Sequence, residues 1–148
     1  MNISADGIAF IKSNEGLKLS PYKDEDGYSV GYGHFLTLDE MRTWTALGRF
    51  PLSEERATAI LMQDLKTVEE GIGQLVHVAL TQNQYDALCD FCFNEGVGAL
   101  ASSTLLKDLN DGHYQMAAAQ LPEWDYAGGQ VNSSLYSRRL REQKLFLA

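Results

Sequence analysis

Apolar residues recur at helical spacing along most of the chain, but a short N-terminal stretch interrupts that pattern. Ile8 and Ile11 lie three residues apart behind Ser4, a residue type that often caps helices. Gly16 is placed to end this first run in a left-handed conformation. We therefore expect a helix over residues 4–15.

Between residues 16 and 52 the pattern changes. Gly, Asp and Tyr alternate with Val and Phe, and turn signals recur at "DEDG" and "GYGH". Short alternating runs between turn signals are typical of antiparallel strands. We predict a small, tightly turned antiparallel sheet here, and then a short helix or turn in "LDEMRTWTALGRFP" before a break.

The longest helical pattern follows Pro51. Ser53 is placed to cap a helix, and Glu54 and Glu55 suit the positive end of its dipole. An apolar stripe then runs along one face. It consists of Ala57, Ile60, Leu61, Leu65 and Val68. We predict a helix over about 53–70 that links the sheet region to the rest of the chain.

The remaining sequence is helical in pattern to its end. Thr81 is placed to cap "TQNQYDALCDFCFNEG", and helices are also predicted in "SSTLLKDLNDG", "HYQMAAAQLPEW" and "SSLYSRRLREQKLFLA". The predicted class is α+β, with a small antiparallel β lobe at about 16–52. The larger, all-helical lobe comprises residues 71–148, approximately, together with the N-terminal helix 4–15. We expect a single domain of 148 residues with a cleft between the lobes.

Charge narrows the range of partners. The formal net charge is −8, which argues against nucleic acid because phosphate binding needs clustered Lys and Arg. The one basic cluster, "SRRLREQK" at 137–144, is predicted to be a solvated last helical turn and not a binding patch. Met1 is not followed by a signal-peptide pattern, and no apolar run reaches the roughly 18–20 residues of a membrane span. We expect neither a signal peptide nor a membrane anchor.

Cys89 and Cys92 form a C-x-x-C pair, a spacing found in redox and metal sites. They lie inside an apolar helical pattern, and no second Cys/His pair stands at zinc spacing. We predict two buried structural thiols and no metal site.

Two acids near the first helix suggest chemistry. Glu15 ends that helix beside a Gly, where the negative end of the dipole and partial burial both favour its protonated form. Asp24 lies nine residues on, at the tip of a turn, where solvent keeps it ionised. Two carboxyl groups in such different environments form the acid/base pattern that cleaves glycosidic bonds. Glu25 and Asp26 precede Gly27 and are predicted to serve only the turn.

The stretch "EGLKLSPYKDEDGYSVGYGH" resembles the opening motif of the phage-type lysozymes, the endolysin muramidases of glycoside hydrolase family 24. In that family a catalytic Glu starts the motif, eight residues separate it from a catalytic Asp, and a Thr follows near a Gly-x-Gly-His. Glu15 and Asp24 have that spacing, and Gly31, Gly33 and His34 close the motif. The helical segments "LTQNQYDALCDFCFNEGVGAL", "SSTLLKDLNDGHYQMAAAQLPEW" and "YSRRLREQKLF" also look like that family, in the same order. The resemblance covers nearly the whole chain and is weakest at about 39–51.

The chain departs from the family pattern at two places. Five residues usually separate the Asp from the Thr, whereas four separate Asp24 from Ser29, so the turn is one residue shorter. Ser29 keeps a hydroxyl but lacks the methyl group that restricts Thr rotamers. Ser134 stands where the family commonly has Gly.

The resemblance implies hydrolysis of the β-1,4 bond between N-acetylmuramic acid and N-acetylglucosamine in bacterial peptidoglycan. Glu15 would protonate the leaving oxygen, and Asp24 with Ser29 would activate a water on the opposite face, which is inverting geometry. Neither metal nor cofactor is implied. The implied substrate contacts are Phe35, Phe93, Thr104 and Gln120, of which the two Phe could equally be core residues. We also predict an ion pair between His34 and Asp64 at the junction of the lobes.

The resemblance further implies a monomer made in the host cytoplasm, released through the inner membrane by a separate holin, and acting on the cell wall in the periplasm. Two other functions stay open. A lytic transglycosylase would cut the same bond without water and leave a 1,6-anhydro end. A glycan-binding relative would keep the groove and have lost turnover.

Overall fold

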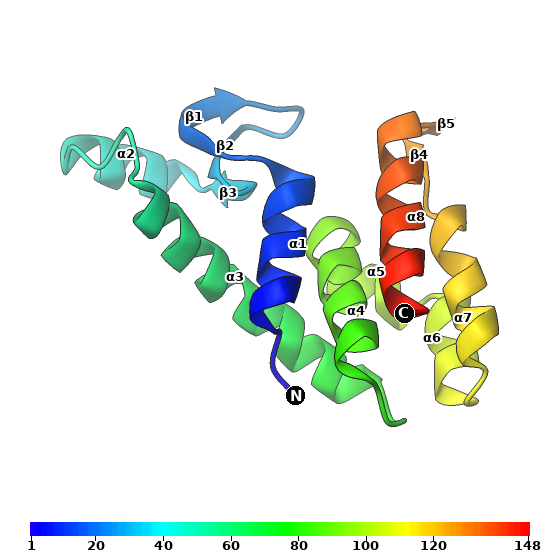
Figure 1. The fold of residues 1–148 in the computed structure, drawn as a ribbon. Helices are drawn as coiled ribbons and strands as arrows, with labels where there is room; N and C mark the ends of the chain where they lie inside the picture. The colour runs from blue at the N-terminus through cyan, green and yellow to red at the C-terminus, as the bar shows by residue number, and fades with distance from the viewer. The chain divides into compact units, whose positions relative to one another are not determined.

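The computed structural model describes residues 1–148 (Figure 1). These residues fall into two units. Unit 1 comprises Met1–Phe10 and Thr67–Ala148, and unit 2 comprises Ile11–Lys66. The boundaries fall inside two helices, α1 (Ala5–Glu15) and α3 (Glu54–Leu75). Each unit therefore holds one part of both helices.

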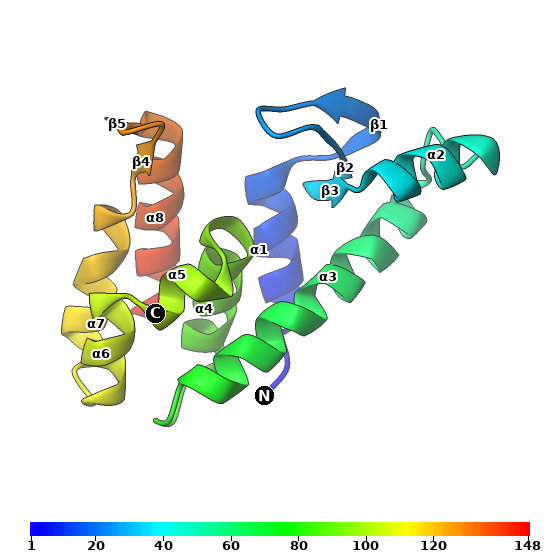
Figure 2. The same cartoon turned by 180° about the vertical axis from the view of Figure 1, so that it is seen from behind.

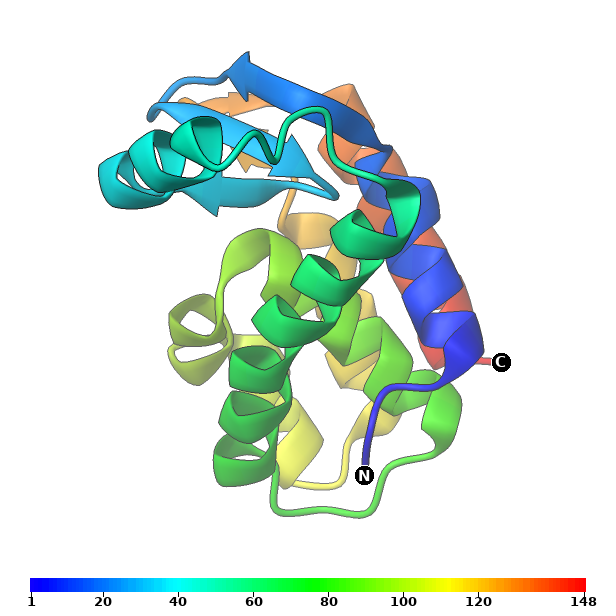
Figure 3. The ribbon, with the colours of Figure 1, turned by 90° about the vertical axis from the view of Figure 1, so that its left-hand side faces the viewer.

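Unit 2 contains the predicted antiparallel sheet. Strands β1 (Lys18–Lys23), β2 (Tyr28–Gly31) and β3 (His34–Leu36) pair in the order β1-β2-β3, as Figure 3 shows. Pro21 is tolerated in β1 because β1 is an edge strand. Helix α2 (Leu38–Ala46) follows, with a capping box formed by Thr37 and Glu40. The sheet and the short helix were both predicted from the sequence.

Unit 1 is helical apart from one small hairpin (Figure 2). Its elements in chain order are α4 (Gln82–Glu95), α5 (Val97–Ala101), α6 (Thr104–Asn110), α7 (Tyr114–Gln120), the 3₁₀ turn η1 (Leu121–Glu123), β4 (Tyr126–Ala127), β5 (Gln130–Val131) and α8 (Ser133–Phe146). Helix α4 packs against α8, and α6 packs against α7. The α+β class predicted from the sequence is confirmed.

The helix ends predicted from the sequence agree with the structure at several residues. Gly16 has φ +72° after α1, and its N–H donates to Lys12 O at 3.0 Å. Thr81 caps α4 in a full capping box with Gln84. The long helix α3 was expected to end near residue 70 and instead runs to Leu75, because Ile72 is a further buried residue of its apolar face.

The prediction for "SRRLREQK" was wrong. Arg139 is fully buried and Arg138 is only 6% exposed, so this segment is no solvated turn. Arg138 binds Asp90 of α4 through two hydrogen bonds of 3.0 and 2.7 Å. Arg139 donates to Glu95, Asn94 and Glu142 at 2.7–3.0 Å. The acids of α4 hold these guanidinium groups inside unit 1, which the pattern of α8 alone did not reveal.

The same core contains the two cysteines, which are buried and free as predicted. Burial raises the pKa of Cys92 to about 12, and it also raises the pKa of Cys89. Both thiols therefore stay protonated at neutral pH, which suits a packing role. No helix in the structure combines the length and apolar character that a membrane crossing needs.

Candidate active site

The hairpin between β1 and β2 positions the predicted acid and hydroxyl. The last paired residues are Lys23 and Tyr28, which leaves 24–27 as the loop. The backbone N–H of Asp24 donates to Gly27 O at 2.8 Å and closes it. This is the turn that is one residue shorter than the family pattern, and the strand residues next to it pair directly, Lys23 with Tyr28 and Tyr22 with Ser29.

Asp24 and Ser29 meet across this short turn. The Ser29 hydroxyl donates to Oδ2 of Asp24 at 2.5 Å, and the N–H of Asp26 donates to Oδ1 at 3.2 Å. The Ser29 hydrogen bond, followed by backbone bonds from the loop, lowers the pKa of Asp24. The Asp24 side chain is exposed whereas Ser29 is buried, so a fixed hydroxyl holds an ionised carboxylate that faces water.

Ser29 also forms the centre of a row of side chains across the sheet. Strand register places it opposite Tyr22 on β1 and opposite Phe35 on β3. Directly opposed residues of antiparallel strands share a face, so the three side chains lie side by side. Phe35 is 51% exposed, which answers the open question about it: the ring is not part of the core.

Tyr22 was not predicted from the sequence. Burial raises its pKa, the charges of Asp24 and Glu15 raise it further, and a hydrogen bond to Ser29 lowers it. Its phenol thus lies close to both predicted catalytic carboxyl groups and to the hydroxyl between the strands. Counting back from the turn, which pairs Lys23 with Tyr28, would have placed Tyr22 opposite Ser29.

Glu15 is the last residue of α1 and is half-buried. Gly16 turns the chain immediately after it, so the side chain stays at the end of the helix where β1 begins. Its influence on Tyr22 puts it in the same neighbourhood as Asp24. Unit 2 by itself therefore contains Glu15, Asp24 and Ser29, and the charges of Glu15 and Asp24 both raise the pKa of Tyr22.

His34 lies on β3 next to Phe35 and contacts two acids. Its Nδ1 is 2.8 Å from Oδ2 of Asp64 on α3, the predicted partner, and its Nε2 is 3.4 Å from Oε1 of Glu40. The Asp64 hydrogen bond is the main cause that raises the pKa of His34, and burial opposes it. Trp44 of α2 stacks on the imidazole at 5.7 Å between ring centroids. These contacts tie β3 to α2 and α3.

The other predicted contact residues belong to unit 1. Phe93 is half-buried on α4, Thr104 is exposed at the start of α6, and Gln120 is half-buried at the end of α7. Their predicted role in substrate binding stays a prediction. No group of three or more His, Cys, Asp or Glu side chains is arranged to hold a metal ion.

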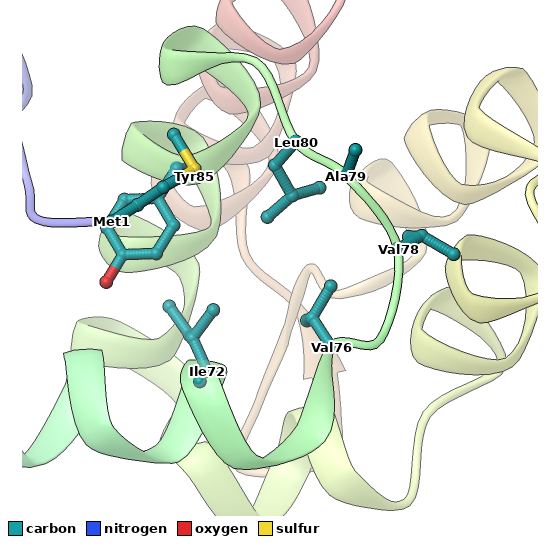
Figure 4. A pocket seen from close by; sticks show the side chains of 8 residues that line it. Met1, Ile72, Val76, Val78, Ala79, Leu80 and Tyr85 are labelled. Atoms are coloured by element: carbon teal, nitrogen blue, oxygen red, sulfur yellow. The ribbon is translucent and has the colours of Figure 1, made fainter.

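Unit 1 also has a hollow of about 370 Å³ that is unsuited to glycan chemistry (Figure 4). Its lining is almost wholly apolar, with Ile72, Val76 and Leu80 pointing into it and the Tyr85 ring closing one side. No Asp, Glu, His, Lys or Arg side chain lines it. Sugar binding needs polar groups that orient the ligand, and the predicted catalytic residues Glu15, Asp24 and Ser29 all lie in unit 2.

Comparison with known proteins identifies the family of the chain. The family model described as phage lysozyme matches residues 12–142. The chain belongs to the phage lysozyme family. It is 40% identical to the endolysin of Salmonella phage P22, covering all of this chain and 99% of that one. A crystal structure of a mutant of P22 lysozyme has a TM-score of 0.85 at 39% identity, covering 100% of this chain and 99% of that one.

Another relative in the phage lysozyme family is longer. The endolysin of Bacillus phage B103 is 42% identical over 99% of this chain, which corresponds to 54% of that protein. The chain thus spans about half the length of the Bacillus phage relatives it matches.

Proposed function

We propose that this protein is a peptidoglycan hydrolase, a muramidase that cleaves the β-1,4 bond between N-acetylmuramic acid and N-acetylglucosamine and thereby lyses bacterial cells. The observation that carries the proposal is the 2.5 Å hydrogen bond from Ser29 to Asp24, in a cluster that also includes Glu15. Membership of the phage lysozyme family supports the choice of a glycan of the bacterial wall as substrate.

In this mechanism Glu15 is the general acid. It protonates the glycosidic oxygen as the bond breaks, and its position at the end of α1 keeps it partly out of water. Positive charge develops on the sugar ring in the transition state, and an ionised carboxylate nearby stabilises it.

Asp24 is the ionised partner. Its lowered pKa keeps it charged at neutral pH, and the exposed carboxylate is open to a water molecule. Ser29 fixes one oxygen of Asp24, so the other can accept a proton from that water as it attacks the sugar. Attack by water from the face opposite the leaving group inverts the anomeric centre.

Phe35 is the proposed sugar platform. Its half-exposed ring lies across β2 from Tyr22, with Ser29 between them. Aromatic rings beside a few oriented polar groups are typical of sites that bind small organic ligands. Phe93, Thr104 and Gln120 complete the proposed set of substrate contacts. A monomeric state, synthesis in the host cytoplasm, dependence on a holin and action in the periplasm are further parts of the proposal.

The test is a turbidity assay on chloroform-treated Gram-negative cells. Glu15→Gln should slow lysis by about 10²- to 10⁴-fold, the usual contribution of a general acid. Glu25→Gln is the matched control, because it removes the same charge from an exposed loop residue, and it should lyse cells like the wild type. A wild type no faster than Glu15→Gln would contradict the proposal.

The products separate hydrolysis from transglycosylation. A hydrolase leaves a reducing end, whereas a lytic transglycosylase leaves a 1,6-anhydro end that mass spectrometry detects. We expect reducing ends, because Asp24 and Ser29 are arranged to activate water. Anhydro ends would assign the same residues to the transglycosylase reaction.

A further inference from the structure

Unit 2 contains a hollow of about 280 Å³ that is separate from the apolar hollow of unit 1. It is formed by side chains of α2, α3 and the segment between these two helices. Its lining residues are Trp44, Arg49, Arg56, Ala59, Ile60 and Gln63. None of these residues takes part in the proposed bond cleavage. The chain as a whole has a net charge of −8, whereas this hollow contains two positively charged arginines.

Arg49 is held in place by an aromatic ring. Its guanidinium carbon lies 5.3 Å from the centroid of the Trp44 ring, and that ring also contacts the rings of His34 and Phe50. A guanidinium that stacks by its face keeps its N–H edge available for hydrogen bonds. Arg49 is therefore oriented in advance, at little further entropic cost to a ligand.

The positive charges of this hollow are not neutralised by ion pairs. Neither Arg49 nor Arg56 has a carboxylate within ion-pair distance, although Glu54 and Glu55 precede Arg56 in the first turn of α3. Asp64 and Glu40, acids of the same two helices, are both turned to His34. Arg56 also lies in the positive first turn of its helix, where an anion is favoured.

We propose that this hollow binds a carboxylate carried by a short peptide. Planar carboxylates match the N–H fork of arginine, and Gln63 adds an amide that can donate to or accept from a peptide group. Ala59 and Ile60 give the hollow an apolar wall suited to a small side chain such as that of alanine. The peptide stem of peptidoglycan would supply such a group. The choice of peptidoglycan as the source rests on the proposed function, whereas the binding site is argued from the hollow alone.

The test is a binding titration followed by ¹H–¹⁵N NMR of the two tryptophan indoles, with N-acetyl-D-alanyl-D-alanine as the probe. The Trp44 signal should shift and saturate. Trp124 lies in unit 1 and serves as an internal control that should not move. The C-terminal amide of the same peptide should cause no saturable shift, because it lacks the charge.

Variants identify the residues responsible. Arg56→Gln should weaken binding about tenfold, the loss expected for a charge-assisted hydrogen bond. Because the Arg56 side chain is exposed, the substitution should leave the fold intact. Arg49→Gln should have a similar effect. Arg42→Gln removes the same charge from an exposed position of α2 outside the hollow and should leave binding unchanged.

Three outcomes would overturn the inference. The first is an equal shift of the Trp44 signal with the peptide acid and with its C-terminal amide. The second is equal weakening of peptide binding by Arg42→Gln and Arg56→Gln. The third is a saturable shift with inorganic phosphate but not with the peptide. Binding is read without hydrolysis. A failed titration beside normal cell lysis would reject this site alone, whereas failed lysis beside normal binding would reject only the proposed function.

Discussion

The two units use charge in opposite ways. In unit 1, Arg138, Arg139 and Glu142 of α8 are buried against Asp90 of α4, and each guanidinium is surrounded by acceptors. In unit 2, Asp24 is exposed and is fixed by one buried hydroxyl from Ser29. The first arrangement uses its charges to join helices, whereas the second leaves a carboxylate open to water.

The difference follows from solvent access. A buried charge costs several kcal/mol to desolvate, so it persists only where charged and polar partners offset that cost, even though Nε of Arg139 and Oε2 of Glu142 have no hydrogen-bond partner. An exposed carboxylate costs little to maintain, and it can exchange water for substrate at each turnover. Identical residue types are thus structural in one unit and available for chemistry in the other.

Arg139→Ala should produce the largest effect. It removes three hydrogen bonds and the ion-pair partner of Glu95 from a fully buried site, so the free energy of unfolding should fall by about 3–5 kcal/mol. Urea denaturation measures it. Arg42→Ala, at an exposed position of α2, is the control and should change stability by less than about 0.5 kcal/mol. A small loss for Arg139→Ala would remove the contrast between the two units.

His34→Gln should have an intermediate, pH-dependent effect. The contacts with Asp64 and Glu40 raise the pKa of His34 above its ordinary 6.5, so its contribution is complete below that pH and is lost as pH rises through the raised pKa. We expect a loss of about 1.5–3 kcal/mol in acidic buffer, shrinking towards alkaline pH. His77→Gln, at an exposed histidine, should show no such trend. A loss independent of pH would contradict the charged pair.

Ser29→Ala tests the bond that fixes Asp24. Without the hydroxyl, the pKa of Asp24 should rise towards its ordinary value, so the acid limb of the lysis–pH profile should move to higher pH. The rate near neutral pH should fall about tenfold, as expected for one lost hydrogen bond to a charged group. Ser29→Thr keeps the hydroxyl and should keep the acid limb in place. An unchanged profile in Ser29→Ala would mean that the bond has no part in catalysis.

Glu142→Gln should have the smallest effect. Burial and the neighbouring Asp90 raise the pKa of Glu142 to about 10, although Arg139 lowers it, so the side chain is protonated at pH 7. A neutral amide of the same shape should then change stability by less than about 1 kcal/mol. The two guanidinium groups are balanced by Asp90 and Glu95. A loss as large as that of Arg139→Ala would show that Glu142 is ionised.

Local sequence signals predicted much of this fold because they act over a few residues. Thr81 and Gly16 mark helix ends by their own hydrogen bonds and backbone freedom, and the apolar stripe of α3 fixes its buried face. The hairpin of β4 and β5 was missed. A Gly-Gly pair is typical of a two-residue hairpin turn, so Gly128 and Gly129 could have predicted it. Both residues have positive φ in the structure.

The residues that were misjudged depend on contacts distant in sequence. Arg139 looked like a surface residue because its acceptors, Asn94 and Glu95, lie on another helix. Tyr22 could be related to Ser29 only through strand register, which the length of the turn decides. Glu15 and Asp24, by contrast, were selected by spacing within one short motif.

The most direct test of the account is the lytic rate of Asp24→Asn, measured at equal concentrations of folded protein. Because Asp24 is exposed, the substitution should change the free energy of unfolding by less than about 0.5 kcal/mol. Lysis should nevertheless fall by about 10²- to 10⁴-fold, because the amide cannot accept a proton from water. A stable variant that lyses cells as fast as the wild type would contradict the role proposed for this carboxylate.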